Sequence, residues 1–161
     1  MKKLLFIFLL LSVKVFAQEE VKSQRINDQC VYIKGKKFEG IAFDEKYIYL
    51  FAGGNQKFTP TTNDIILAER ILIENIANIN DTSNQKLFIR KNLKKYYRQY
   101  VGYINDQNEK VIFINFFWKK SINKTRLNEQ MHVLDGGNHY WQIRINIPKS
   151  KLFDFYVNGE G

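Results

Sequence analysis

The only two histidines of the chain, His132 and His139, lie on either side of the turn sequence Asp135-Gly136-Gly137. If the flanking segments pair as strands, both imidazoles lie near the base of this turn with the Asp135 carboxylate nearby. A metal site or an acid–base pair could be built from these three side chains. Two histidines and one aspartate are too few for a closed metal site, so we predict that Asp135 shapes the turn and that the histidines are ordinary strand residues. We therefore expect no metal and no cofactor.

Glu69 is a further candidate for a catalytic carboxylate, because it follows Ala68 inside the strongest helical pattern and could point toward a sheet. An exposed helical glutamate is the commoner case, and the adjacent Arg70 favours an ordinary solvent-facing pair. The chain contains no glycine-rich phosphate loop, nucleophile elbow, Cys-x-x-Cys pair or His-Glu-x-x-His sequence. The sequence thus predicts no catalytic site and favours a protein that is not an enzyme.

Aromatic residues make up 15% of the chain and are concentrated in its second half. Tyrosine and tryptophan side chains beside arginines can stack on sugars or hold a peptide. The residues we predict for such a surface are Arg98, Tyr100, Trp118, Tyr140, Trp141 and Arg144. The commoner case, which we favour for most of the rings, is that they fill a core covered by a helix and by loops.

The first seventeen residues have the pattern of a cleaved secretory signal peptide. Two lysines follow the initial methionine, residues 4–11 contain no polar side chain, and Val15 and Ala17 suit the signal peptidase. The apolar run is shorter than the roughly 20 residues that span a bilayer, so we expect no transmembrane segment after cleavage. We predict an exported protein, either periplasmic or secreted, with residues 18–29 as a flexible leader and residues 30–161 as one domain.

The formal net charge of the chain is +9, and it falls to +6 when the three lysines of the signal peptide are removed. A basic surface attracts phosphates, acidic glycans or anionic lipids. Nucleic acid is not an expected partner of an exported protein.

Apolar spacing predicts one main helix after Thr61, where Asp64 completes a capping box. Its apolar stripe consists of Ile65, Ala68, Leu72, Ile76 and Ile79. A second, shorter helical segment is expected over 87–93. Strands are expected at 30–34, 37–43, 47–52, 96–105, 110–119, 130–134, 139–147 and 152–157. With a single cysteine, Cys30, no intramolecular disulfide can form, and we expect this residue to be buried in a strand.

These elements predict an α+β fold in which one main helix packs on a curved antiparallel sheet with a C-terminal meander of four strands. The helix-then-meander order is similar to the cystatin and NTF2-like arrangements, an analogy of fold that does not carry function. Segments of the chain also resemble small uncharacterised exported proteins of Bacteroidota, which implies compartment and lineage only. That resemblance covers about residues 58–161 and is carried by the export junction Val15-Phe16-Ala17-Gln18 and by the segments 97–105, 111–115, 133–137, 140–141 and 157–159.

Three classes of function remain open. The favoured class is an exported, non-enzymatic module that binds a protein, peptide or glycan of the cell envelope. The second is a small enzyme or ligand carrier that uses a cavity between helix and sheet. The third is a peripheral binder of an anionic surface polymer or lipid. Strong loss of binding with added salt would identify the third class, because salt screens exposed charges.

Overall fold

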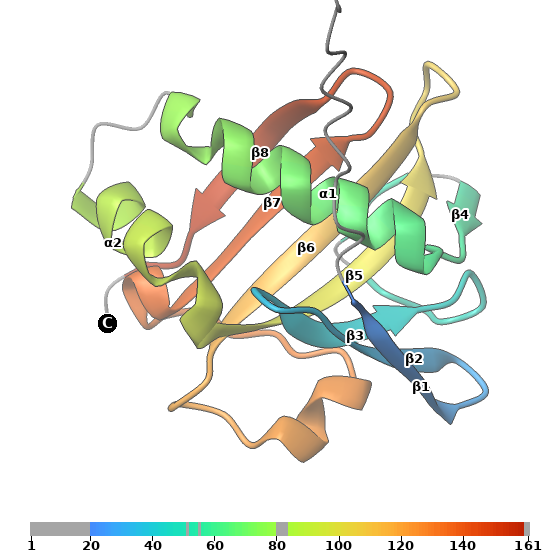
Figure 1. The fold of residues 1–161 in the computed structure, drawn as a ribbon, viewed down its shortest axis with the longest axis horizontal. Helices are drawn as coiled ribbons and strands as arrows, with labels where there is room; N and C mark the ends of the chain where they lie inside the picture. Colours follow the sequence, from blue (N-terminus) through green and yellow to red (C-terminus); the bar gives the residue numbers. More distant parts are fainter. Residues whose placement is uncertain (1–19, 51, 55, 80–83, 160–161) are drawn as a thin grey trace, which may run out of the picture.

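The computed structural model describes residues 20–50, 52–54, 56–79 and 84–159, and the predicted signal peptide lies outside these residues. The chain forms an α+β structure in which a long helix crosses one face of an eight-stranded sheet (Figure 1). A second helix lies beside one end of this sheet. Within the described part of the chain, no helix is both long and apolar enough to cross a membrane.

The sheet is continuous from one edge strand to the other, in the order β1-β2-β3-β5-β6-β7-β8, with β4 paired to β5. The strands are β1 (Lys22–Asn27), β2 (Cys30–Lys34), β3 (Glu39–Phe43), β4 (Gln56–Phe58), β5 (Tyr96–Ile104), β6 (Lys110–Trp118), β7 (Tyr140–Asn146) and β8 (Lys151–Val157). Strands β5 to β8 form the predicted four-stranded antiparallel meander. Strand β3 pairs in parallel with β5, so the sheet is mixed. The prediction of a sheet that is antiparallel throughout is therefore wrong.

Three further predictions about strands and leader differ from the structure. Residues 22–27 form strand β1 and are not a flexible leader, although every side chain of β1 is exposed and no apolar alternation marks it. Residues 47–50 and 130–134 are not strands. Their backbone groups bond to side chains instead, as when the Tyr47 carbonyl accepts from Lys57 Nζ at 3.0 Å and the Gln130 amide donates to Tyr47 Oη at 2.7 Å.

The main helix α1 (Thr62–Asn75) begins as the sequence predicts. The Thr61 side chain accepts from the Asp64 amide at 3.1 Å, and the Asp64 carboxylate accepts from the Thr61 amide at 2.9 Å. This reciprocal capping satisfies two backbone donors that the first turn of a helix leaves without partners. A 3₁₀ turn, η1 (Ile76–Asn78), follows α1 directly.

The second helix, α2 (Asn84–Asn92), is longer than the helical segment predicted over 87–93, so the described residues contain two α-helices where one main helix was predicted. It continues into a 3₁₀ turn, η2 (Leu93–Lys95), which leads directly into β5. Ile89 is fully buried on the inner side of α2. Two more 3₁₀ turns, η3 (Lys124–Asn128) and η4 (Gly137–His139), lie between β6 and β7.

Each face of the sheet carries its own apolar cluster because side chains alternate along the strands. On the face beneath α1, Phe116 and Trp141 stack with their ring centroids 3.5 Å apart and pack with residues of the helix. On the other face, Phe113 and Tyr49 belong to a cluster that also includes residues of the loops 44–54 and 119–136. Cys30 is buried in β2 within this second cluster, as predicted.

Candidate binding surface

Glu69 points from α1 onto the sheet and forms a buried ion pair with Arg98 of β5. The distance from Arg98 Nε to Glu69 Oε1 is 2.6 Å, and the side chains are 1% and 3% exposed. The Tyr100 hydroxyl donates to the same carboxylate oxygen at 2.9 Å. Arg98 also donates to the carbonyls of Tyr96 at 2.9 Å and Leu93 at 3.2 Å. The prediction that Glu69 faces solvent beside Arg70 is therefore wrong.

This pair has the geometry of a structural link between helix and sheet. Burial, and then the nearby Glu69 charge, raise the pKa of Tyr100 well above its usual value, so its hydroxyl remains a donor at neutral pH. Glu69 lines neither of the two cavities described below, and its surroundings are the apolar cluster beneath α1. Buried charges of this kind are tolerated only when they are paired and hydrogen-bonded.

The two histidines lie in different environments. His132 is exposed in the segment before the turn, whereas the His139 ring stacks on Trp118 at 4.9 Å and lies 6.1 Å from Phe88. The predicted pairing of strands across the turn does not form, because 130–134 is not a strand. Among the described residues, no group of three or more histidine, cysteine, aspartate or glutamate side chains could hold a metal ion.

The six residues predicted as a binding surface are divided between the two faces of the sheet. Arg98, Tyr100 and Trp141 are at most 1% exposed beneath α1, so no ligand reaches them in this structure. Tyr140 and Arg144 alternate with Trp141 and so face the other side, where the Arg144 guanidinium lies 5.2 Å from the Phe113 ring centre. Trp118 is partly exposed at the end of β6. The structure thus does not bring these six side chains together.

A cavity of about 110 Å³ lies on the loop-covered face, between strands β6 to β8 and residues 132–134. Its lining includes two of the predicted site residues, His132 and Tyr140, together with Gln142 and Asn115. A more open groove of about 740 Å³ follows the edge strand β8. The 110 Å³ cavity is well below the 300–1,000 Å³ typical of drug-sized ligand sites.

Exposed cationic side chains are concentrated in three segments of the chain. Three segments, 34–37, 84–95 and 119–126, contain no acidic residue. Together they carry twelve cationic side chains: Lys34, Lys36, Lys37, Lys86, Arg90, Lys91, Lys94, Lys95, Lys119, Lys120, Lys124 and Arg126. All of these except Lys86 and Lys119 are classed as exposed. We call this surface the basic face.

The fold brings the three segments of the basic face together at one end of the sheet. Strand β3 runs parallel to β5 with Gly40 opposite Arg98, which places the β2–β3 turn beside the start of β5. The η2 turn ends at the same point, and the Lys119 amide donates to the Lys95 carbonyl at 2.9 Å. Residues distant in sequence therefore concentrate positive charge in one region.

One carboxylate, that of Glu39, is built into the basic face. Its oxygens lie 3.0 Å from Lys119 Nζ and 2.8 Å from Lys124 Nζ, and the Tyr32 hydroxyl donates to it at 2.6 Å. Burial by itself raises the pKa of Glu39, but hydrogen bonds from Lys124, Tyr32 and Lys119 outweigh this effect and lower the pKa to about 2. Glu39 thus holds the segments 34–39 and 119–124 together while it remains ionised.

This ion-pair network predicts a specific loss of stability in acid. A lowered pKa in the folded state contributes stability above the unfolded pKa of about 4.3, and this contribution is lost as the pH falls toward 2. Between pH 6 and pH 3, we expect the wild type to lose roughly 2 kcal/mol more unfolding free energy than Glu39→Gln. Urea denaturation at both pH values measures the difference, and equal losses in the two proteins would contradict the role of Glu39.

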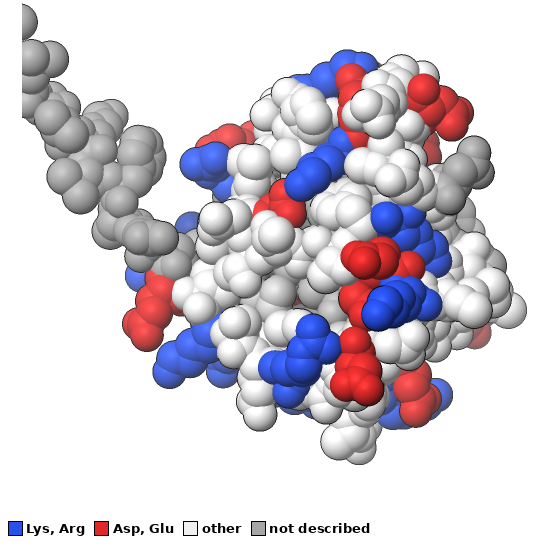
Figure 2. Space-filling view, turned by 90° about the vertical axis from the view of Figure 1, so that its right-hand side faces the viewer, with Lys and Arg blue, Asp and Glu red and all other residues white. Residues whose placement is uncertain are grey.

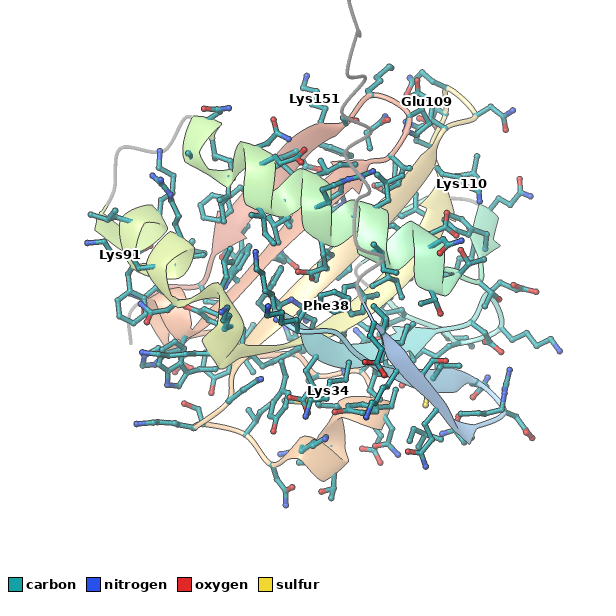
Figure 3. All side chains as sticks on the ribbon, viewed as in Figure 1. Lys34, Phe38, Lys91, Glu109, Lys110 and Lys151 are labelled. Carbon is teal, nitrogen blue, oxygen red and sulfur yellow. The ribbon has the colours of Figure 1, made fainter. Side chains whose placement is uncertain are left out.

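The opposite end of the molecule has a different charge pattern. Figure 2 shows the side near β4, where blue and red side chains are interspersed. Lys110 pairs there with Asp64 at 3.5 Å, and Lys149 pairs with Glu109 at 2.7 Å. Lys91 lies on the outer side of α2, far from Glu109 and Lys110 (Figure 3). The β4 side thus carries charges of both signs, whereas the segment 84–95 of α2 and η2 carries cations and no acidic residue.

The sequence indicates an excess of positive charge but not the surface that the cationic residues form. Their common location depends on the parallel pairing of β3 with β5, a contact between residues nearly sixty positions apart. The inward position of Glu69 had a local signal, because Ile65, Glu69, Leu72 and Ile76 repeat at helical spacing. Comparison of the chain with protein-family models, curated proteins and solved structures finds no significant match.

Proposed function

We propose that this protein is an exported, non-enzymatic binding module that attaches to a polyanionic partner through its basic face. The observation that carries the proposal is the convergence of three acid-free segments at one end of the sheet. Clustered cations of this kind create a positive potential that attracts repeated phosphate or carboxylate groups. The proposal corresponds to the third class of function given above, the peripheral binder of an anionic surface polymer or lipid.

The composition of the basic face supports a partner recognised by its charge density. Ten of its twelve cations are lysines, whose flexible ammonium groups act as point charges. Arginine, with its planar fork, dominates where single phosphates are held in fixed geometry. A lysine-rich surface is therefore suited to a partner that carries many similar anionic groups.

The two other classes have less support. A binding site made of Arg98, Tyr100 and Trp141 would require the α1 side of the sheet to open, since these residues are buried. An enzyme or carrier that used the interface between α1 and the sheet would require space there, whereas Ile65, Ala68 and Ile114 fill it with no exposed surface.

Export and the finer fold assignment are parts of the same proposal. A polyanionic partner on a cell surface is reachable only if residues 1–17 direct the chain out of the cytoplasm, and N-terminal sequencing of the processed protein would reveal whether cleavage follows Ala17. The helix laid across the β5–β8 meander supports a cystatin-like or NTF2-like architecture, with β1 to β4 as additions.

Binding to soluble polyphosphate tests the proposed function. The triple variant Arg90→Gln, Lys94→Gln, Lys120→Gln removes three exposed cations of the basic face for which the structure shows no ion pair. We expect it to weaken binding about thirtyfold, because each cation lost forgoes the release of a counterion. We also expect wild-type affinity to fall at least about tenfold between 50 and 200 mM salt.

A matched control removes the same charges from other parts of the surface. The variant Lys46→Gln, Arg70→Gln, Lys151→Gln also loses one arginine and two lysines, all exposed. It should retain binding within about threefold of the wild type at equal salt, since its substitutions lie outside the basic face. Equal loss in both triple variants would show that only net charge matters and would overturn the proposal.

A further inference from the structure

The outward side of α2 and η2 carries a stripe of exposed residues that combines three cations with one apolar side chain. Leu87, Arg90 and Lys91 follow the spacing i, i+3, i+4, which places them on one side of α2, and Lys94 follows in the η2 turn. All four are exposed, and Leu87 is 46% exposed. We call these four residues the outer stripe.

The opposite side of α2 is anchored to the protein, so the outer stripe has a fixed orientation. Ile89 is fully buried in the cluster beneath α1, and Leu93 packs against that cluster. The Phe88 ring lies 5.6 Å from Trp118, and the Lys86 ammonium donates to the Ile79 carbonyl at 2.7 Å. The helix therefore presents the stripe outward without having to fold or turn when a partner binds, which removes an entropic cost of binding.

We propose that the polyanionic partner is an anionic lipid bilayer, on which α2 lies with Leu87 inserted at the headgroup–acyl boundary. This inference rests on the proposed function and names the partner of the same surface. A soluble anionic polymer would satisfy the cations but would leave Leu87 in water. A bilayer offers both environments, since headgroups meet Arg90, Lys91 and Lys94 while the acyl boundary accepts the leucine.

Each interaction makes a modest contribution, so attachment is reversible. A lysine or arginine held near an anionic membrane strengthens binding about fivefold. A leucine side chain that leaves water contributes roughly tenfold, reduced in this case because Leu87 is already half covered. Neither contribution alone is sufficient to hold the protein on a bilayer, and the outer stripe combines the two on one surface.

Vesicle co-sedimentation at 100 mM salt tests the inference with the processed protein from its native host. The vesicles contain either phosphatidylcholine alone or phosphatidylcholine with 30% phosphatidylglycerol. We expect binding only to the anionic vesicles, and we expect Leu87→Gln to weaken it about fivefold while leaving the affinity for polyphosphate unchanged. The control Ile48→Gln replaces an aliphatic side chain that is 77% exposed outside the basic face, and it should bind like the wild type.

The outcomes separate this inference from the proposed function. Binding to polyphosphate without binding to anionic vesicles would identify a soluble polymer as the partner and overturn only the bilayer. Wild-type vesicle binding by Leu87→Gln, or equal loss in Leu87→Gln and Ile48→Gln, would also overturn the insertion of Leu87. A protein that binds neither polyphosphate nor anionic vesicles would overturn both proposals. Circular dichroism checks that each variant is folded.

Discussion

Replacing Arg98 by methionine is expected to lower the free energy of unfolding by about 3–5 kcal/mol, as measured by urea denaturation at pH 7. The substitution leaves the Glu69 carboxylate buried without the guanidinium that lies 2.6 Å away, and a buried charge without a partner is costly. It also removes the donors to the Tyr96 and Leu93 carbonyls. The loss is large because α1 and β5 are joined at this point beneath the helix.

Two controls separate the ion pair from general effects of the substitution. Arg90→Met changes an exposed arginine and should alter stability by no more than about 0.5 kcal/mol. The double variant Glu69→Leu, Arg98→Met removes both charges and should recover much of the loss, because an apolar pair of similar size can replace a buried ion pair. If Arg98→Met is as stable as Arg90→Met, the pair makes no structural contribution.

Replacing Trp141 by alanine is expected to cost about 3–5 kcal/mol of unfolding free energy, because it empties the centre of the core beneath α1. Trp141 is fully buried, its ring is nearly parallel to that of Phe116 at 3.5 Å, and it meets the Tyr96 ring edge-on at 5.8 Å. A cavity of this size cannot be closed by small movements of neighbours that are themselves close-packed. Urea denaturation measures the loss.

The matched substitution Tyr156→Ala removes another large ring, from the neighbouring strand β8, but this ring is 54% exposed. It should change the unfolding free energy by no more than about 1 kcal/mol, since most of its surface is already in contact with water. Similar losses in Trp141→Ala and Tyr156→Ala would contradict the central position of Trp141. Weakened ligand binding by a folded Trp141→Ala protein would instead support a binding role for this residue.

Local sequence patterns predicted the elements that depend on neighbouring residues. Thr61 and Asp64 form the capping box because both partners lie within one helical turn. The β5–β6 hairpin followed from two β-prone runs joined by four polar residues, and its strands pair from Tyr96 with Trp118 to Ile104 with Lys110. Helix α2 was predicted too short because its residues are mostly polar or cationic, so its first turn resembles a loop sequence.

The sequence did not predict which face of the sheet each aromatic residue occupies, nor which face is covered by α1. Tyr100 and Trp141 were assigned to a ligand surface, yet they lie beneath α1. A tyrosine or tryptophan suits both a core and a binding surface, so residue type alone does not decide between them. The packing of α1 makes that decision, and it depends on contacts between segments distant in sequence.

The start of α1, the β5–β6 hairpin, the buried strand with Cys30 and the excess of positive charge can all be predicted from the amino-acid sequence, because each depends on composition or on residues a few positions apart. The contact of Glu69 with Arg98 and the assembly of three lysine-rich segments into one basic face become visible only once the chain is folded. Both results depend on the position of β5, which pairs with β3 in parallel and lies beneath α1. Such long-range contacts are set by packing and chain closure, for which no short stretch of residues carries a signal.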